Sequence, residues 1–171
     1  LVTSIREAGM RLIGPNALGL INTDPRVQMN ASLVKDIPGR GRIGFFCQTG
    51  AFGAAILTEA QRRGLGVSTF LSAGNRADVS ANDLLQYWED DDSTSVVCLF
   101  LESIGNPRKF TRIARRLASR KPVVAVRSGR STQALPMGHA VRRTELPVAA
   151  VDAMLEQAGV IQVDTLGEML D

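Results

Sequence analysis

Residues 95–110 read SVVCLFLESIGNPRKF, and this stretch decides the fold class. Its first part, 95–104, is a nearly continuous apolar run, which is typical of a parallel strand covered on both faces. Asn106 and Pro107 favour a helix start, because asparagine caps a first turn and proline fits its first position. The apolar residues that follow keep helical spacing: Phe110, Ile113 and Leu117. The stretch therefore predicts a strand followed directly by an amphipathic helix.

The same pattern recurs on both sides of this stretch. We expect strands at 11–16, 41–47, 66–74, 95–104, 121–128 and 159–165, and helices at 51–63, 80–90, 106–120 and 147–158. This alternation predicts an α/β fold with a doubly wound, mostly parallel sheet and right-handed crossovers. Ligands of such folds bind at the carboxyl ends of the strands, near the switch in strand order. The residues that follow each strand are therefore the candidates for function.

Composition is that of an ordinary globular protein, with 44% hydrophobic and 22% charged residues among 171. No apolar run is long enough to cross a bilayer, and residues 1–10 lack the features of a signal peptide. Cys47 and Cys98 both lie in apolar strands, which suggests core thiols in a reducing compartment. We expect a cytoplasmic protein without a membrane partner.

The net charge of +3 comes largely from residues 107–121, where arginines alternate with an apolar helical face. The favoured interpretation is a solvated helix surface. Nucleic-acid binding usually adds aromatic side chains for stacking, and the one Trp and one Tyr lie elsewhere. We therefore expect no nucleic-acid partner.

Two strand ends are followed by candidate site residues. Thr49 and Gly50 lie where strand 41–47 meets its helix, and main-chain amides at such a junction can bind an anion; a plain capped turn is the alternative. Gly74 and Asn75 follow strand 66–74, where a tight turn is the favoured interpretation.

Two titratable residues are candidates for catalysis. Glu102 ends a wholly apolar run, and a carboxylate there needs a partner or an exposed rim position. His139, the one histidine, lies in the long segment 129–147; it is either a catalytic group or an ordinary exposed side chain. Phosphate-loop, dinucleotide and nucleophile-elbow motifs are absent from the sequence, and one histidine with two separated cysteines predicts no metal site.

Several segments together resemble the NDP-forming acyl-CoA synthetases, which include the succinyl-CoA synthetase alpha subunit and the ADP-forming acetyl-CoA synthetases. The similar segments are GPNALGLIN, GRIGFFCQTGAFGAAI, FLSAGNRADVSANDLLQYWEDD, LFLESI, KPVVAVRSGR, MGHA and the final VDAMLEQAGVIQVDTLGEMLD. The resemblance implies a flavodoxin-like fold. It implies that 1–30 is the C-terminal remnant of a CoA-binding Rossmann domain with its linker. It also implies that 31–171 is the synthetase-like region, in halves of about 31–128 and 129–171.

The resemblance also assigns roles to the candidate residues. His139 in MGHA matches the histidine that is phosphorylated in the family, and Glu102 matches the glutamate that orients it. Thr49 and Gly50 match the helix start that holds the phosphate, and Gly74 and Asn75 match residues that support the site. CoA and Mg-ADP or Mg-ATP are expected in the full-length protein, with an ATP-grasp domain or subunit as partner, and neither cofactor is expected on this fragment alone.

Departures from the family pattern keep a second hypothesis open. Val141, Arg142 and Arg143 follow His139 where the family has small residues, and Thr49 stands where serine is common. This variant pattern also resembles synthetase modules fused to a GNAT acetyltransferase, in which the synthetase part is regulatory. A third, structural hypothesis is a domain that only docks an ATP-grasp partner.

Overall fold

The computed structural model describes residues 1–128 and 147–171. The helices are α1 (Val2–Glu7), α2 (Gly50–Arg62), α3 (Ala81–Asp90), α4 (Pro107–Ala118), α5 (Val148–Gln157) and α6 (Leu166–Leu170). The strands are β1 (Gly19–Asn22), β2 (Met29–Ser32), β3 (Arg40–Cys47), β4 (Val67–Ser72), β5 (Val96–Leu101), β6 (Val123–Arg127) and β7 (Ile161–Val163).

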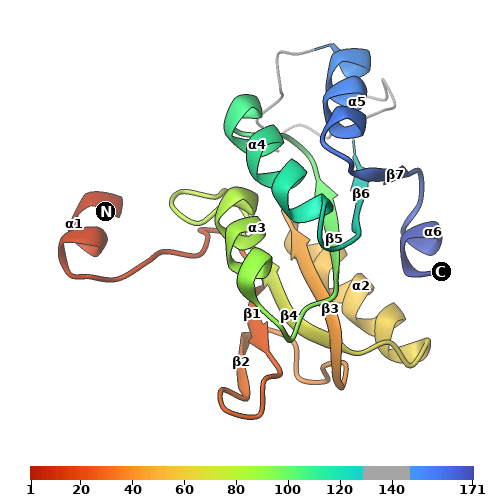
Figure 1. The fold of residues 1–171 in the computed structure, drawn as a ribbon. Coiled ribbons are helices and arrows are strands. Elements are labelled where there is room, and N and C mark those ends of the chain that lie inside the picture. The colour runs from red at the N-terminus through yellow and green to blue at the C-terminus, as the bar shows by residue number, and fades with distance from the viewer. Residues whose placement is uncertain (129–146) are drawn as a thin grey trace.

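The strands form one seven-stranded sheet with the order β2-β1-β4-β3-β5-β6-β7 (Figure 1). Strands β3 to β7 pair with one another in parallel, whereas β1 is antiparallel to both β2 and β4. This is the doubly wound, mostly parallel α/β sheet that the alternating apolar runs predict.

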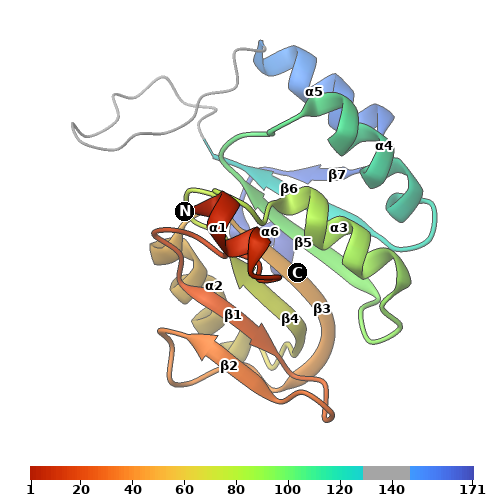
Figure 2. The same cartoon turned by 90° about the vertical axis from the view of Figure 1, so that its left-hand side faces the viewer.

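Helices cover both faces of the sheet. Helices α3, α4 and α5 lie on one face, and α2 and α6 lie on the other (Figures 1 and 2). The packing of strand β5 explains why its sequence is apolar throughout. Val97, Leu99 and Leu101 pack toward α3–α5, and the intervening Cys98 and Phe100 pack toward α2 and α6. Because successive side chains point to opposite faces, both faces need apolar residues.

Most of the predicted elements are confirmed to within a few residues. Ser80 is the N-cap of α3, and the side chain of Asn106 accepts a hydrogen bond from the Lys109 N–H at the start of α4. Cys47 and Cys98 are buried free thiols, as the apolar strands predict. No helix of the described residues is long and apolar enough to span a membrane.

The prediction of a strand at 11–16 is wrong. This segment is an irregular connection in which Gly14 and Asn16 have left-handed φ angles of 105° and 59°, so the backbone cannot remain extended. The first two strands are instead β1 and β2, an antiparallel hairpin-like pair that the search for buried parallel strands missed. Strand β2 is mostly exposed, so it lacks the apolar run that identified the others.

Candidate functional site

The candidate site lies at the carboxyl ends of β3 and β5, which are neighbours in the sheet. The connection after β3 returns through α2 to β4 on one side, whereas the connection after β5 runs through α4 to β6 on the other. Adjacent strands whose connections diverge in this way form the topological switch point where α/β folds bind ligands. Thr49, Gly50 and Glu102 all follow these two strands.

Gln48 joins the two strand ends. Its Oε1 accepts hydrogen bonds from the N–H groups of Glu102 (2.7 Å) and Ser103 (2.9 Å), and its Nε2 donates to the Ser103 carbonyl (2.8 Å). The residue is only 4% exposed. The sequence analysis missed Gln48, although a glutamine directly after a buried strand was a usable signal, because a buried amide must find partners.

The start of α2 presents main-chain N–H groups at this edge that make no hydrogen bond to the described residues. Thr49 is the N-cap but makes no side-chain capping bond, and the first turn contains no acidic residue. In contrast, α3 and α6 both close their first turns with a capping box. The positive end of the α2 dipole is therefore uncompensated by its own side chains, which favours an anion.

Gly50 begins this helix beside Leu18, with enough room for a small side chain. An added Cβ would meet the Leu18 N at 3.6 Å, an ordinary contact distance. Packing therefore does not require a glycine here, and its small size leaves the main chain accessible.

Glu102 is half-buried at the end of β5, with its main chain held by Gln48. Burial raises the pKa of the neighbouring Cys47 thiol to about 12, and the negative charge of Glu102 contributes in the same direction. Cys47 also donates through Sγ to the Thr49 carbonyl (3.0 Å). The Glu102 carboxylate thus lies near the segment that begins α2, and Cys47 is a neutral structural thiol at ordinary pH.

The turn after β4 makes hydrogen bonds both to the segment before β1 and to the residues after β5. Gly74 has a left-handed φ of 52°, and a Cβ there would lie 2.2 Å from the Asn16 carbonyl oxygen, so this position needs glycine. Asn75 is exposed and donates its N–H to the Pro15 carbonyl (2.9 Å). Arg76 donates to the Ser103 carbonyl (3.1 Å) and to Ser103 Oγ (2.6 Å). The turn therefore reaches the end of β5, as a supporting element would.

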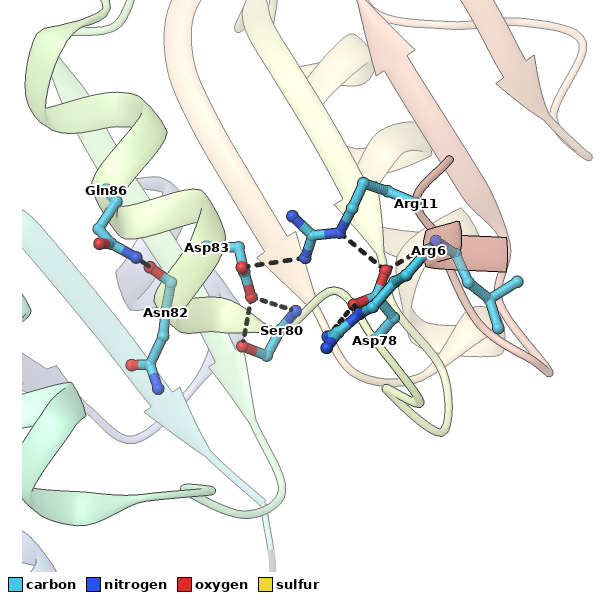
Figure 3. Close-up of polar contacts among 8 residues, drawn as sticks. Arg6, Arg11, Asp78, Ser80, Asn82, Asp83 and Gln86 are labelled. Carbon is cyan, nitrogen blue, oxygen red and sulfur yellow. Dashed lines mark hydrogen bonds and ion pairs between the residues drawn. The ribbon is translucent and has the colours of Figure 1, made fainter. Parts of the chain in front are cut away.

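A buried carboxylate ties the N-terminal segment to this turn (Figure 3). The fully buried side chain of Asp78 accepts from Arg11 Nε (2.8 Å), from the Leu12 N–H (3.0 Å) and from Arg6. Hydrogen bonds from Arg11 first, then from Leu12 and Arg6, hold the pKa of Asp78 below its usual range. The sequence analysis does not single out Asp78, because its two arginine partners are more than 60 positions away.

His139 lies outside the described residues, so the structure does not test its distance from Glu102 or Gly50. Among residues 1–128 and 147–171, no group of three or more His, Cys, Asp or Glu side chains could hold a metal ion.

Comparison with known proteins identifies the family of this domain. Residues 40–171 match the family described as "Succinyl-CoA ligase like flavodoxin domain". The chain belongs to this family. The match covers β3 to α6, and hence every strand end of the candidate site.

Relatives of this flavodoxin-like domain are ligases. The chain is 37% identical to acetate–CoA ligase [ADP-forming] I of Archaeoglobus fulgidus, over all of this chain and 25% of that protein. It is 32% identical to the acetate–CoA ligase [ADP-forming] II subunit alpha of Pyrococcus furiosus, over 99% of this chain and 37% of the subunit. It spans about a quarter of the length of the first curated relatives it matches, 25%, 24% and 23%.

A solved structure shares the fold. The dinucleotide forming acetyl-coenzyme A synthetase 1 of Ca. Korarchaeum cryptofilum, in complex with phosphate and ADP, superposes with a TM-score of 0.87 at 28% identity. The superposition covers 99% of this chain and 37% of that protein.

Proposed function

We propose that this chain is the phosphoryl-carrying part of an NDP-forming acyl-CoA synthetase. The overall reaction converts acyl-CoA, NDP and phosphate into the free acid, CoA and NTP. One observation carries the proposal: Gln48, which lies two residues before the uncapped start of α2, binds the main chain of Glu102 and Ser103 at the switch point of the sheet. The ADP-forming ligases among the relatives support this reaction class.

Each step moves one group. Phosphate displaces CoA from the acyl-CoA and forms an acyl phosphate. An unprotonated ring nitrogen of His139 then attacks the phosphorus, and the carboxylate leaves with the electron pair of the broken P–O bond. The phosphohistidine finally transfers the phosphoryl group to NDP. Histidine suits this role because its near-neutral pKa leaves a ring nitrogen available for attack.

The described residues would assist the histidine in two ways. The Glu102 carboxylate would accept a hydrogen bond from the ring N–H of His139 and so fix the tautomer that attacks. The N–H groups that follow Thr49 would bind the phosphoryl oxygens at the positive end of α2, without rearrangement during transfer. Gly74 and Asn75 would support the site from the adjacent turn, through its contact with the end of β5.

Other parts of the full-length protein would bind the cofactors. We assign 1–30 to the end of a CoA-binding domain and 31–171 to the synthetase-like region, divided near residue 128. CoA and Mg-nucleotide would be bound by the CoA-binding domain and by an ATP-grasp domain or subunit.

The test is formation of acid-labile, base-stable phosphate on the full-length protein supplied with acyl phosphate. We expect labelling in the native protein, no labelling in His139→Asn, and labelling slowed at least tenfold in Glu102→Gln. A phosphate bond that survives mild acid, or equal labelling of His139→Asn, would overturn the proposal.

The same labelling experiment distinguishes the proposed enzyme from the regulatory hypothesis. A regulatory module attached to an acetyltransferase predicts no labelling in any variant and a changed acetyltransferase rate when 31–171 is deleted. A purely docking module predicts that His139→Asn and Glu102→Gln change no activity at all.

A further inference from the structure

The segment 107–121, which contains α4, holds seven cationic side chains and no acidic one. The cations at its C-terminal end have partners on α3. Arg116 pairs with Glu89 (2.8 Å), and Arg120 lies 3.9 Å from a carboxylate oxygen of Asp90. Lys121 donates to two main-chain carbonyls at the end of the same helix. This end of α4 is therefore neutralised within the domain.

The N-terminal part of α4 is different, because its cations have no counter-charge. Their side chains are exposed and make no hydrogen bond or ion pair within residues 1–128 and 147–171. We call this set of residues the cationic face: Arg108, Lys109, Arg112 and Arg115. The spacing of its members places them along one side of the helix, over a length of about 10 Å.

The cationic face costs helix stability in two ways. Cations in a first turn lie at the positive end of the helix dipole, and α4 has Arg108 and Lys109 there with no acidic residue. Like charges three or four positions apart, such as Arg108 and Arg112, also repel each other. By contrast, α3 and α6 place Asp83 and Glu168 in their first turns. A local rule that is broken without a compensating contact inside the domain indicates a functional surface.

The packing of α4 restricts what can bind to it. The helix lies between α3 and α5, side by side with them in one layer (Figures 1 and 2). Its apolar side chains Phe110, Ile113 and Leu117 are at most 2% exposed and belong to the core. The helix therefore cannot turn an apolar side toward a lipid bilayer, and it cannot enter a nucleic-acid groove without its neighbours.

Acidic side chains at the other end of this layer restrict the partner further. Asp90 and Asp92 are exposed where α3 ends, and Asp90 lies beside Arg120. An extended polyanion, such as duplex nucleic acid or an anionic membrane, would meet these carboxylates as well as the cationic face. A folded protein can place its own carboxylates opposite the cations alone. Within Pro107–Ala118 no large apolar side chain is exposed, whereas permanent interfaces are largely apolar.

We propose that the cationic face docks a separate protein that presents an acidic patch, in a transient and salt-sensitive complex. The partner supplies about four carboxylates, one for each cation of the face. Helix α4 begins five residues after Glu102, so the docked partner lies at the edge of the sheet that holds the candidate site. The inference does not rest on the proposed function, because it uses only the charges and packing of α4.

The test is binding of acidic probes to the full-length protein at low and at physiological salt. The probes are a fluorescent peptide of alternating glutamate and serine, a fluorescent DNA duplex, and vesicles that contain phosphatidylserine. We expect the peptide to bind the native protein with an affinity that falls as salt is added. Arg108→Glu/Arg112→Glu should weaken peptide binding by about tenfold or more. The control Lys35→Glu/Arg40→Glu makes the same change in net charge at exposed positions elsewhere, and should weaken binding less than about threefold.

The charge reversal on α4 should also raise the thermal unfolding midpoint of the free protein, because it places a carboxylate at the positive end of the helix dipole. Arg108→Gln/Arg112→Gln provides the binding comparison if the reversed variant does not fold. A lower midpoint in a folded Arg108→Glu/Arg112→Glu protein would show that the cations have partners inside the protein, and would overturn the proposal.

Three binding results would also overturn it. The first is absence of peptide binding to the native protein. The second is equal weakening in the α4 variant and in the control, which would reduce the effect to net charge. The third is tighter binding of the duplex or the vesicles than of the peptide, which would exclude an acidic protein as the preferred partner. Failure of the phosphorylation assay would leave all of these results unaffected.

Discussion

The side-chain amide of Gln48 pairs with the main chain of Ser103 in both directions, at 2.8 Å and 2.9 Å. The Gln48 side chain thus makes the hydrogen bonds to the main chain after β5 that a neighbouring strand would otherwise make. The pairing fixes where Glu102 leaves the sheet, immediately before Ser103. The geometry of the candidate site therefore depends on a residue that takes no part in the proposed chemistry.

Gln48→Leu should destabilise the protein by about 2–4 kcal/mol, because it removes three hydrogen bonds, two of them buried, and leaves main-chain groups unpaired. Urea unfolding of the native and variant proteins measures the difference. Gln61→Leu, at an exposed position of α2, is the control and should stay within about 0.5 kcal/mol. Equal stability of Gln48→Leu and the native protein would show that the pairing is unimportant.

Gly74→Ala should cost about 2–4 kcal/mol, because alanine is strained at positive φ and its Cβ would overlap the Asn16 carbonyl. Gly39→Ala is the matched control, since nothing lies within 4 Å of a Cβ there. Thermal unfolding should show a clear loss for the first variant and little change for the second. A Gly74→Ala protein as stable as the control would contradict the close approach of segment 12–16 to this turn.

Stability should depend on pH through Asp78. Its pKa in the folded protein is below the ordinary value of about 3.9, so the carboxylate stabilises the fold above that pH. This contribution is lost as the pH falls from about 4 through the lower folded pKa. Asp78→Asn should therefore lower the unfolding midpoint at pH 6 and should approach the native midpoint as the pH falls below 4.

Asp36→Asn, at an exposed position outside the Arg6–Arg11 cluster, is the control for this pH series. Its unfolding midpoint should follow that of the native protein at every pH of the series. A constant difference between Asp78→Asn and the native protein from pH 6 to pH 2 would be incompatible with a carboxylate stabilised in its charged form.

Both cysteines should resist modification in the folded state. Burial raises the pKa of Cys47 and of Cys98 to about 12, so both remain protonated and inaccessible at pH 8. In the folded protein we expect both thiols to react with a thiol reagent only as fast as the protein unfolds. In about 6 M urea, which unfolds most small domains, both thiols should react at once. Rapid labelling of the native protein would show that β3 or β5 opens locally.

Asn82→Leu should raise the free energy of unfolding by about 1 kcal/mol, because it replaces an unpaired buried oxygen with apolar volume. Urea unfolding of the ligand-free protein measures this change. Marked destabilisation would indicate that the amide has a structural partner.

The sequence by itself determined the parallel part of the sheet and most of its helices. Strands β3 to β6 are buried on both faces, so their apolar runs are recognisable without any knowledge of neighbours. Capping residues such as Ser80 and Asn106 act within one turn, so local sequence was also sufficient to place the starts of α3 and α4. The family resemblance named Glu102, Thr49 and Gly50, and each of them lies at the predicted sheet edge.

Only the tertiary structure decided which distant residues meet. The β1–β2 pair lacks a two-sided apolar pattern because it lies at the sheet edge, and the irregular segment before it is shaped by contacts with the turn at Gly74. Gln48 and Asp78 matter because of hydrogen-bond partners that are far away in the sequence. Asn82 stands out because its buried Oδ1 has no partner among the described residues. Local propensity contains no information on such pairings, because they are created when the strands and helices pack.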